Sequence, residues 1–186
     1  MSARPHAGAP GRVTFLGTGT SSGVPMIGCS CAVCRSDDSR DRRLRPSIHL
    51  DVPGRASLLV DTTPDFRQQA LTHGLSRLDA ILFTHSHADH ILGLDEIRRF
   101  NWMQGGAIPC YADARTWDHI KRTFYYAFDG APRQGGGIPK IEAHEITGPW
   151  TVGGVRIVPV PLWHGAMPIL GFRFGSVAYL TDCTRL

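Results

Sequence analysis

The run His85-Ser86-His87-Ala88-Asp89-His90 contains the side chains of this sequence best suited to chemistry. Its three imidazoles and one carboxylate are ligands that zinc and similar borderline metals accept. His85 and His87 are two residues apart, so in extended backbone their side chains point to the same side. We expect the chain then to turn into a helix, which would direct Asp89 and His90 toward a neighbouring position. The run therefore predicts a site for two metal ions close together.

A second group of ligand-type side chains, Cys29, Cys31 and Cys34, forms a C-x-C-x-x-C pattern. Three thiolates this close can bind one zinc ion, although a closed structural site needs a fourth ligand. The polar N-terminus lacks the apolar core of a secretory signal, so we expect a cytoplasmic protein whose thiols stay reduced. The pattern favours a structural zinc site, with unrelated buried thiols as the alternative and a redox pair as a weaker one.

Apolar runs bounded by Gly, Pro or Asp predict the elements that must position these side chains. Strands are expected at residues 12–17, 47–52, 57–61, 80–84, 108–111, 155–160, 169–174 and 176–181, and helices at residues 64–72, 92–99 and 114–126. The histidine run follows the expected strand 80–84, at the carboxyl end where open sheets usually place sites. Turn residues at 52–55 and 175–176 predict two hairpins. Hairpins followed by helices favour an α/β sandwich over a doubly wound parallel sheet.

Length and composition fit one globular domain. The chain has 186 residues and 42% hydrophobic residues, which is enough to bury a core. We interpret residues 1–11 as a disordered lead-in and residues 12–186 as a single domain. No apolar stretch approaches the ~20 residues that span a bilayer, so no membrane partner is expected. The net charge of +4 includes a basic run at residues 40–45, which could attract a phosphorylated substrate or nucleic acid, or form a solvated loop.

Several other residues invite a functional interpretation but favour a structural one. Five aromatic residues could line a substrate pocket, although aromatics at helical spacing more often belong to a core: Trp102, Phe124, Tyr125, Tyr126 and Phe128. The spacing of Gly17, Gly19 and Gly23 is G-x-G-x-x-x-G, which differs from the dinucleotide-binding pattern and indicates a loop near the metals. Most of the histidines outside the motifs are expected to be solvated: His49, His73, His119 and His144.

The histidine run resembles the HxHxDH signature of the metallo-β-lactamase superfamily, and further segments extend the resemblance. Residues 15–25 are similar to the opening strand and loop of the family's phosphodiesterase branch. Residues 60–67 are similar to its DTGPDFR element, with Thr63 where glycine is usual. Residues 162–165 and 179–183 resemble the third and fourth ligand motifs. The nearest branch by motif is that of the phosphoribosyl 1,2-cyclic phosphate phosphodiesterases, so the resemblance implies an α/β fold, the αββα sandwich.

The resemblance also implies roles for individual residues. It assigns His85, His87 and His164 to one metal and Asp89 and His90 to the other, with Asp182 as the bridging ligand. Asp61 would orient a ligand histidine by hydrogen bonding.

Two divalent metal ions, zinc or manganese with nickel as a further choice, would act at this site, with Asp89 and Asp182 as the catalytic residues. Cys29, Cys31 and Cys34 would hold a structural zinc ion, a feature that separates this branch from the tRNA 3′-processing ribonucleases.

The function implied is hydrolysis of a phosphodiester, most of all a small cyclic one, by a hydroxide shared between the metals. A tRNA 3′-processing ribonuclease is the alternative enzyme, and it would need an extended basic surface or an added arm to hold RNA. A non-catalytic metal-binding module is the alternative of another class. The expected partner is thus a small phosphodiester, with nucleic acid less favoured and a homodimer as a further expectation.

Chains of this family normally continue beyond the position of Asp182. They add a last metal-binding histidine, a histidine that assists the leaving group, and the fourth ligand of the cysteine site. This sequence stops at Leu186, so we expect a truncated chain in which the second half of the sandwich is incomplete. The second metal should then be held weakly, and the exposed sheet face should favour pairing with another chain.

Overall fold

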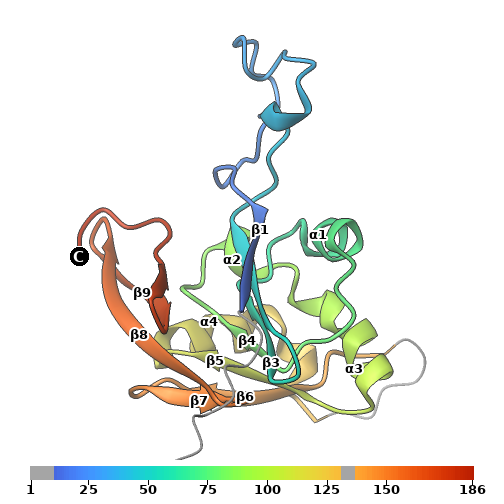
Figure 1. Ribbon diagram of the computed structural model, residues 1–186, viewed down its shortest axis with the longest axis vertical. Coiled ribbons are helices and arrows are strands. Elements are labelled where there is room, and N and C mark those ends of the chain that lie inside the picture. Colours follow the sequence, from blue (N-terminus) through green and yellow to red (C-terminus); the bar gives the residue numbers. More distant parts are fainter. Residues whose placement is uncertain (1–10, 131–136) are drawn as a thin grey trace, which may run out of the picture.

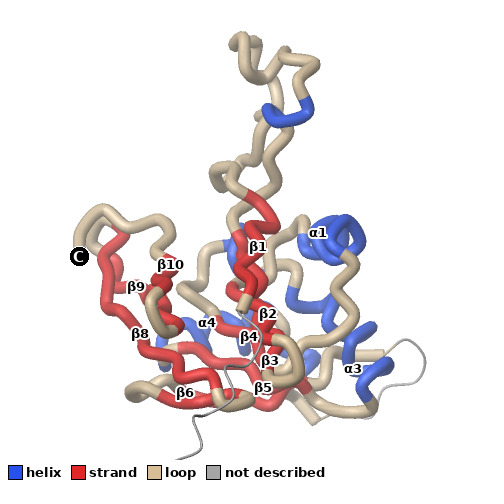
Figure 2. Tube along the Cα trace, viewed as in Figure 1, coloured by secondary structure: helices blue, strands red, loops and turns tan. Residues whose placement is uncertain are grey.

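The computed structural model describes residues 11–130 and 137–186, which form two packed β-sheets with helices against one of them (Figures 1 and 2). The expected lead-in therefore lies outside the described residues, except for Gly11. The first sheet has the strand order β1-β2-β3-β4-β5-β6. Its strands are β1 (Arg12–Gly17), β2 (Ser47–Val52), β3 (Ala56–Val60), β4 (Ala80–Leu82), β5 (Ile108–Ala112) and β6 (Ile141–Glu145).

The first sheet contains both antiparallel and parallel strand pairs. β1, β2 and β3 pair antiparallel, whereas β3, β4, β5 and β6 pair parallel. The predicted hairpin between β2 and β3 is confirmed, with Arg55 N–H donating to the carbonyl of Val52 over 2.9 Å and Gly54 at φ 70°. Parallel neighbours need longer crossovers, and here the crossovers carry the helices.

The second sheet is entirely antiparallel and has the strand order β10-β9-β8-β7. Its strands are β7 (Trp150–Val152), β8 (Val155–His164), β9 (Met167–Phe174) and β10 (Val177–Tyr179). The predicted hairpin at residues 175–176 joins β9 to β10, as expected. The long strands β8 and β9 extend on the side of the molecule where the chain ends (Figure 1).

The helices lie on the outer side of the first sheet. They are α1 (Phe66–His73), α2 (Ala88–Ile91), α3 (Arg98–Gln104) and α4 (Ala114–Thr123), with the 3₁₀ turns η1 (Ser39–Asp41), η2 (Leu94–Ile97) and η3 (Tyr125–Ala127). Apolar residues of all four α-helices enter one buried cluster with that sheet. None of the helices in the described residues is long and apolar enough to cross a bilayer.

Alternating side chains of the central strands divide the core in two. Leu58 and Val60 pack against Phe172 of the second sheet, whereas Leu59 and Ile81 pack against the helices. Because the central strands are buried on both faces, their sequences are continuously apolar. The resulting αββ layers confirm the predicted α/β sandwich with its second half incomplete, as far as the described residues extend.

Several predicted bounds need correction. The predicted helix at residues 92–99 is in fact η2 followed by α3, which runs to Gln104 and ends at Gly105 with φ 75°. Strands β6 and β7 were not predicted, because Ile141–Glu145 carries three polar side chains and Trp150–Val152 is very short. Polar residues are common on edge strands, which must avoid pairing with other chains.

Residues 18–46, hereafter the arm, leave the first sheet between β1 and β2 and project far from the domain (Figure 1). One antiparallel β-bridge holds its base together, since Val24 and Arg43 exchange two backbone hydrogen bonds of 2.9 and 2.8 Å. Gly17 is required where the arm begins, because a Cβ there would lie 2.1 Å from the carbonyl oxygen of Arg45. The arm carries the three clustered cysteines.

Gly93 is a second position where the fold needs the absence of a side chain. A Cβ at Gly93 would lie 2.0 Å from the carbonyl oxygen of Thr63, whereas one at Gly106 would meet no atom within 4 Å. We predict that Gly93→Ala lowers the free energy of unfolding by about 1–3 kcal/mol through overpacking. Urea denaturation checks this, with Gly106→Ala as the control that should stay within ~0.5 kcal/mol. Equal stability of the two variants would contradict the close packing at Gly93.

Candidate metal centre

The histidine run lies where the sequence predicts, at the carboxyl end of β4. The strand predicted at residues 80–84 ends at Leu82, and α2 begins at Ala88 within the histidine run. His85 is buried, with 2% of its surface exposed, whereas His87 is exposed. Nε2 of His85 lies 3.1 Å from Nδ1 of His87, so the two imidazoles converge as their spacing predicts.

His164 completes the first group from the second sheet. It is the last residue of β8, and its ring centroid lies 5.1 Å from that of His87 and 5.7 Å from that of His85. One potential ligand atom from each of these three residues lies within 4.8 Å of the others. The structure therefore brings together the three imidazoles that the resemblance assigns to one metal.

The second group forms around His90, which is fully buried. Its Nε2 lies 3.0 Å from a carboxylate oxygen of Asp182 and 3.3 Å from one of Asp89. The same Asp182 oxygen is 3.7 Å from Nε2 of His85. His85, His90 and Asp182 accordingly form the second set of ligand atoms within 4.8 Å. Asp182 thus belongs to the second group, and His85 is the residue that the two groups share. Asp89 contacts His90 but lies outside both sets of ligand atoms.

Asp61 directly follows β3 and forms hydrogen bonds to residues of the candidate site. Its buried carboxylate accepts hydrogen bonds from the N–H and the hydroxyl of Thr84, each over 2.8 Å. It also lies 2.8 Å from Nδ1 of His90. A carboxylate on one ring nitrogen fixes the tautomer that leaves the other nitrogen for a metal. Asp61 therefore has the geometry of the orienting residue.

Burial and neighbouring charges shift the pKa values of His85 and His90 in opposite directions. Burial, together with His90 and His87, lowers the pKa of His85 to about 3, so this imidazole is neutral and able to coordinate a metal. Burial also disfavours a charged His90, but the Asp61 and Asp182 carboxylates raise its pKa to about 12. The hydrogen bond from His90 lowers the pKa of Asp182 to about 2. Metal binding at His90 must therefore release a proton.

The donor set and one buried atom fit divalent metal ions. Imidazole and carboxylate together suit zinc, manganese and nickel. Nδ1 of His164 is buried and has no hydrogen-bond partner in the described part of the chain. A buried polar atom without a partner costs free energy, and a metal near the three imidazoles could remove that cost.

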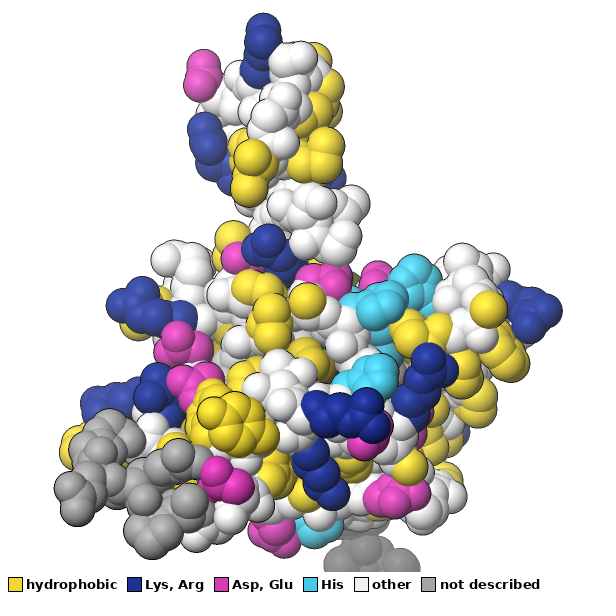
Figure 3. Space-filling model, turned by 180° about the vertical axis from the view of Figure 1, so that it is seen from behind, with side chains coloured by type: hydrophobic (Ala, Val, Ile, Leu, Met, Phe, Trp, Pro, Cys, Tyr) yellow, Lys and Arg dark blue, Asp and Glu magenta, His cyan; other side chains and the backbone are white. Residues whose placement is uncertain are grey.

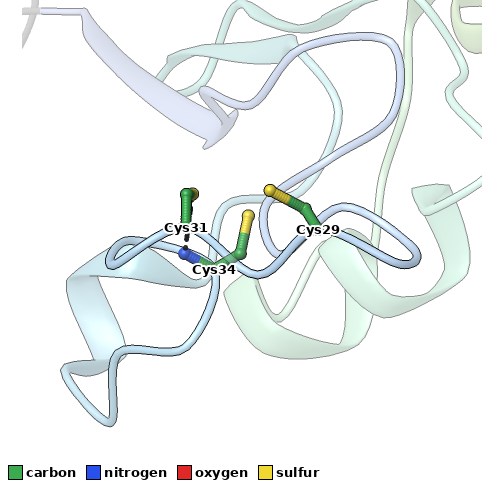
Figure 4. A group of neighbouring side chains, drawn as sticks. All are labelled: Cys29, Cys31 and Cys34. Carbon is green, nitrogen blue, oxygen red and sulfur yellow. Dashed lines mark hydrogen bonds between the residues drawn. The ribbon is translucent and has the colours of Figure 1, made fainter.

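The three cysteines of the arm also converge (Figure 4). The sulfur atoms of Cys29, Cys31 and Cys34 lie within 4.8 Å of one another. Backbone N–H groups point at two of them, from Met26 to Cys34 over 3.4 Å and from Cys34 to Cys31 over 3.5 Å. The N–H of Cys34 is the main reason that the pKa of Cys31 is lowered. This contact favours a thiolate at Cys31, the form that binds zinc. At Cys34 the N–H of Met26 lowers the pKa, but the neighbouring thiols of Cys29 and Cys31 outweigh it and the pKa is raised.

Three of the five aromatic residues follow the structural interpretation. Phe124, Tyr126 and Phe128 belong to or pack against the helix-side core. Trp102 and Tyr125 are exposed, and Trp102 stacks against the guanidinium of Arg99.

Two side chains near the site were not predicted to contribute to it. The hydroxyl of Thr84 lies 3.0 Å from Nδ1 of His85 as well as contacting Asp61. His119 of α4, expected to be solvated, is half-buried and contacts Ser86. The sequence does contain a pattern that indicates burial of His119. Trp117 and Ile120 mark the buried face of a helix, and His119 borders that face.

Comparison with known proteins identifies the family. The family described as "Beta-lactamase superfamily domain" matches residues 57–186, so this chain belongs to the β-lactamase superfamily. The crystal structure of a diphosphatase from the PhnP family is similar with a TM-score of 0.82 and 46% identity, over 92% of this chain and 65% of that chain. Zinc-bound PqqB from Methylobacterium extorquens shares the fold, with a TM-score of 0.67 and 23% identity, over 94% of this chain and 66% of that chain.

Curated relatives are considerably longer than this chain. An octanoyltransferase of Porphyromonas gingivalis is 41% identical over 171 residues, which are 92% of this chain and 34% of that protein. The coenzyme PQQ synthesis protein B of Methylobacterium nodulans is 35% identical over 97 residues, 45% of this chain and 32% of that protein. The chain spans about a third of the first of these proteins, whose name describes the whole molecule.

Asp61 provides a test of the geometry that is independent of catalysis. Asn fits the positive φ of 63° at this position, but it cannot accept all three hydrogen bonds. We predict that Asp61→Asn weakens zinc binding by about 10–100-fold, measured by competition with a chromogenic chelator.

The control is Asp79→Asn at the opposite end of β4. This carboxylate also accepts a backbone hydrogen bond, from Ser57 over 2.8 Å, but it contacts no histidine of the site. An equal loss of zinc affinity in both variants would show that Asp61 acts only through general stability.

Proposed function

We propose that this chain carries the metal centre of a hydrolase that cleaves phosphodiesters. The observation that supports this most strongly is the convergence of ligand atoms from His85, His87 and His164, and from His85, His90 and Asp182, each within 4.8 Å. Two neighbouring groups of nitrogen and oxygen ligands suit a pair of divalent metals, zinc or manganese. The similarity to a PhnP-family diphosphatase supports a substrate that contains phosphorus.

The proposed ligands would fall into two sets, one for each metal ion. His85, His87 and His164 would hold one metal, Asp89 and His90 the other, and Asp182 would join the two. When bound, such a metal pair supplies a water of lowered pKa and neutralises charge on phosphoryl oxygens.

The protein's own contribution is orientation. Asp61 keeps the protonated Nδ1 of His90 directed away from the metals. The exposed side chain of His87 borders the open side of the site. Seen from behind, histidine side chains gather at the surface beside the base of the arm, where a substrate could reach them (Figure 3).

A small cyclic phosphodiester, such as a phosphoribosyl 1,2-cyclic phosphate, is the substrate class we favour, because the matching motifs belong to that branch. The structural zinc site at Cys29, Cys31 and Cys34 is part of the same proposal. Reduced thiols there fit a cytoplasmic protein. Homodimer formation stays a prediction, as does the division into a lead-in and one domain.

The first test removes one ligand. We predict that His87→Ala lowers zinc-dependent or manganese-dependent hydrolysis of bis(p-nitrophenyl) phosphate by at least about 100-fold, since losing a ligand should exceed the ~10–100-fold effect of losing an outer partner. His87 is exposed, so the variant should stay folded. His73→Ala, an exposed histidine of α1, should retain activity. Retained activity in His87→Ala would exclude this centre.

The same assay separates the alternatives. Competition by a cyclic ribose phosphate, but not by tRNA, is the expected result. Competition by tRNA alone would favour the ribonuclease. Tight binding of two metals without turnover of any diester would favour a non-catalytic metal-binding module.

The second test concerns the arm. We predict that Cys31→Ser removes about one equivalent of zinc and lowers the melting temperature, while the specific activity of the folded protein changes little, because a thiolate site lies apart from the reaction. Ser30→Ala, an exposed neighbour in the same loop, should keep that zinc. Elemental analysis and calorimetry measure both effects. A selective loss of turnover, with melting and zinc content unchanged, would show that the cysteines act in catalysis.

A further inference from the structure

His119 of α4 contacts the metal-binding loop between two of its ligands. Its Nδ1 lies 2.6 Å from the hydroxyl oxygen of Ser86, a short hydrogen bond. Ser86 stands between His85 and His87 in the sequence. The contact therefore acts on the backbone that carries both imidazoles.

The two ends of the loop at residues 84–90 are held by other groups. Thr84 is fixed by Asp61, and the carbonyl of His90 accepts a hydrogen bond of 2.8 Å from the N–H of Thr62. Among the described residues, the backbone of Ser86 makes no hydrogen bond to another backbone group. The carbonyl of His87 accepts a hydrogen bond of 3.0 Å from the N–H of His90, so the side-chain bond to His119 is the contact that holds Ser86, the residue between His85 and His87.

α4 is a firm support for this contact. Asp113 caps its first turn by accepting from the N–H of Thr116 over 2.7 Å. Trp117 is buried, donates from Nε1 to the carbonyl of His144 over 2.8 Å, and packs edge-on against Phe83 at 6.5 Å. Phe83 immediately precedes the loop. The helix therefore braces the loop at its base through Trp117 and at its middle through His119.

We propose that His119 is a positioning residue of the metal centre, which acts through Ser86 to hold His85 and His87 in the orientation that a metal requires. A loop that is ordered in advance loses less conformational freedom when the metal binds, so binding is tighter. This proposal rests on the proposed metal centre, but it does not depend on which substrate is cleaved.

The test compares two substitutions of similar size at His119. Asn places a polar δ atom near the position of Nδ1, whereas Leu places a methyl group there. We expect His119→Leu to weaken the tighter zinc site about tenfold, at the low end for an outer hydrogen-bond partner, and His119→Asn to stay within about threefold of the unchanged protein. Chelator competition measures both, with His73→Leu on α1 as the control that should leave the affinity unchanged.

Ser86→Ala removes the same bond from the other side. If the pair acts as one unit, the double variant His119→Leu/Ser86→Ala should bind zinc no more weakly than the worse single variant. Hydrogen exchange of the metal-free protein provides a readout without metal. Amides of residues 85–87 should exchange faster in both single variants, while those of β4 stay protected.

Each outcome bears on one proposal. Unchanged zinc affinity and exchange in His119→Leu, equal losses in the Asn and Leu variants, or multiplicative losses in the double variant would each overturn the positioning role. Failure of the unchanged protein to hydrolyse any diester, with the expected effects on zinc binding and exchange, would overturn only the proposed function. If the unchanged protein binds no zinc, the exchange experiment alone decides the role of His119.

Discussion

A single buried carboxylate holds the candidate centre together. Asp61 has no exposed surface, yet it carries a charge and lies between β3, β4 and α2. A buried charge is tolerated only when it is paired and hydrogen-bonded, and here Thr84 and His90 supply those bonds. The strands on either side must keep their parallel register for these bonds to form, so the site and the sheet cannot shift independently.

Two of the proposed ligands come from segments distant from the histidine run in the sequence. His164 and Asp182 reach the site because the second sheet packs its inner face, including Ile157 and Phe172, against the central strands of the first. The carbonyl of Thr84 also accepts a hydrogen bond of 3.0 Å from the N–H of Leu170 on β9. This bond ties the ligand loop directly to the second sheet, so apolar packing and one backbone bond determine how closely the two ligand sets meet.

Much of this arrangement could be predicted from the sequence. The HxHxDH run after an apolar strand, and the turns at residues 52–55 and 175–176, could be predicted because residues close together in the sequence determine them. Local patterns failed where tertiary context decides. The polar strand β6 is stabilised by pairing with β5. The helix predicted at residues 92–99 is replaced by η2 and α3, and Gly93, which precedes η2, packs against the backbone of Thr63. The contact of His119 with Ser86 joins residues 33 positions apart, and no local pattern specifies it.

Asp61 and Asp182 share a backbone property that limits which side chains fit at these two positions. Both have positive φ, 63° and 55°, and they are the only non-glycine residues with that property in the described chain. Asp, Asn and Gly adopt this conformation most readily. Glutamate offers the same carboxylate but would strain the backbone at either position. Replacing either aspartate by glutamate would therefore cost about 1–2 kcal/mol of backbone strain, in addition to moving the carboxylate by one methylene group.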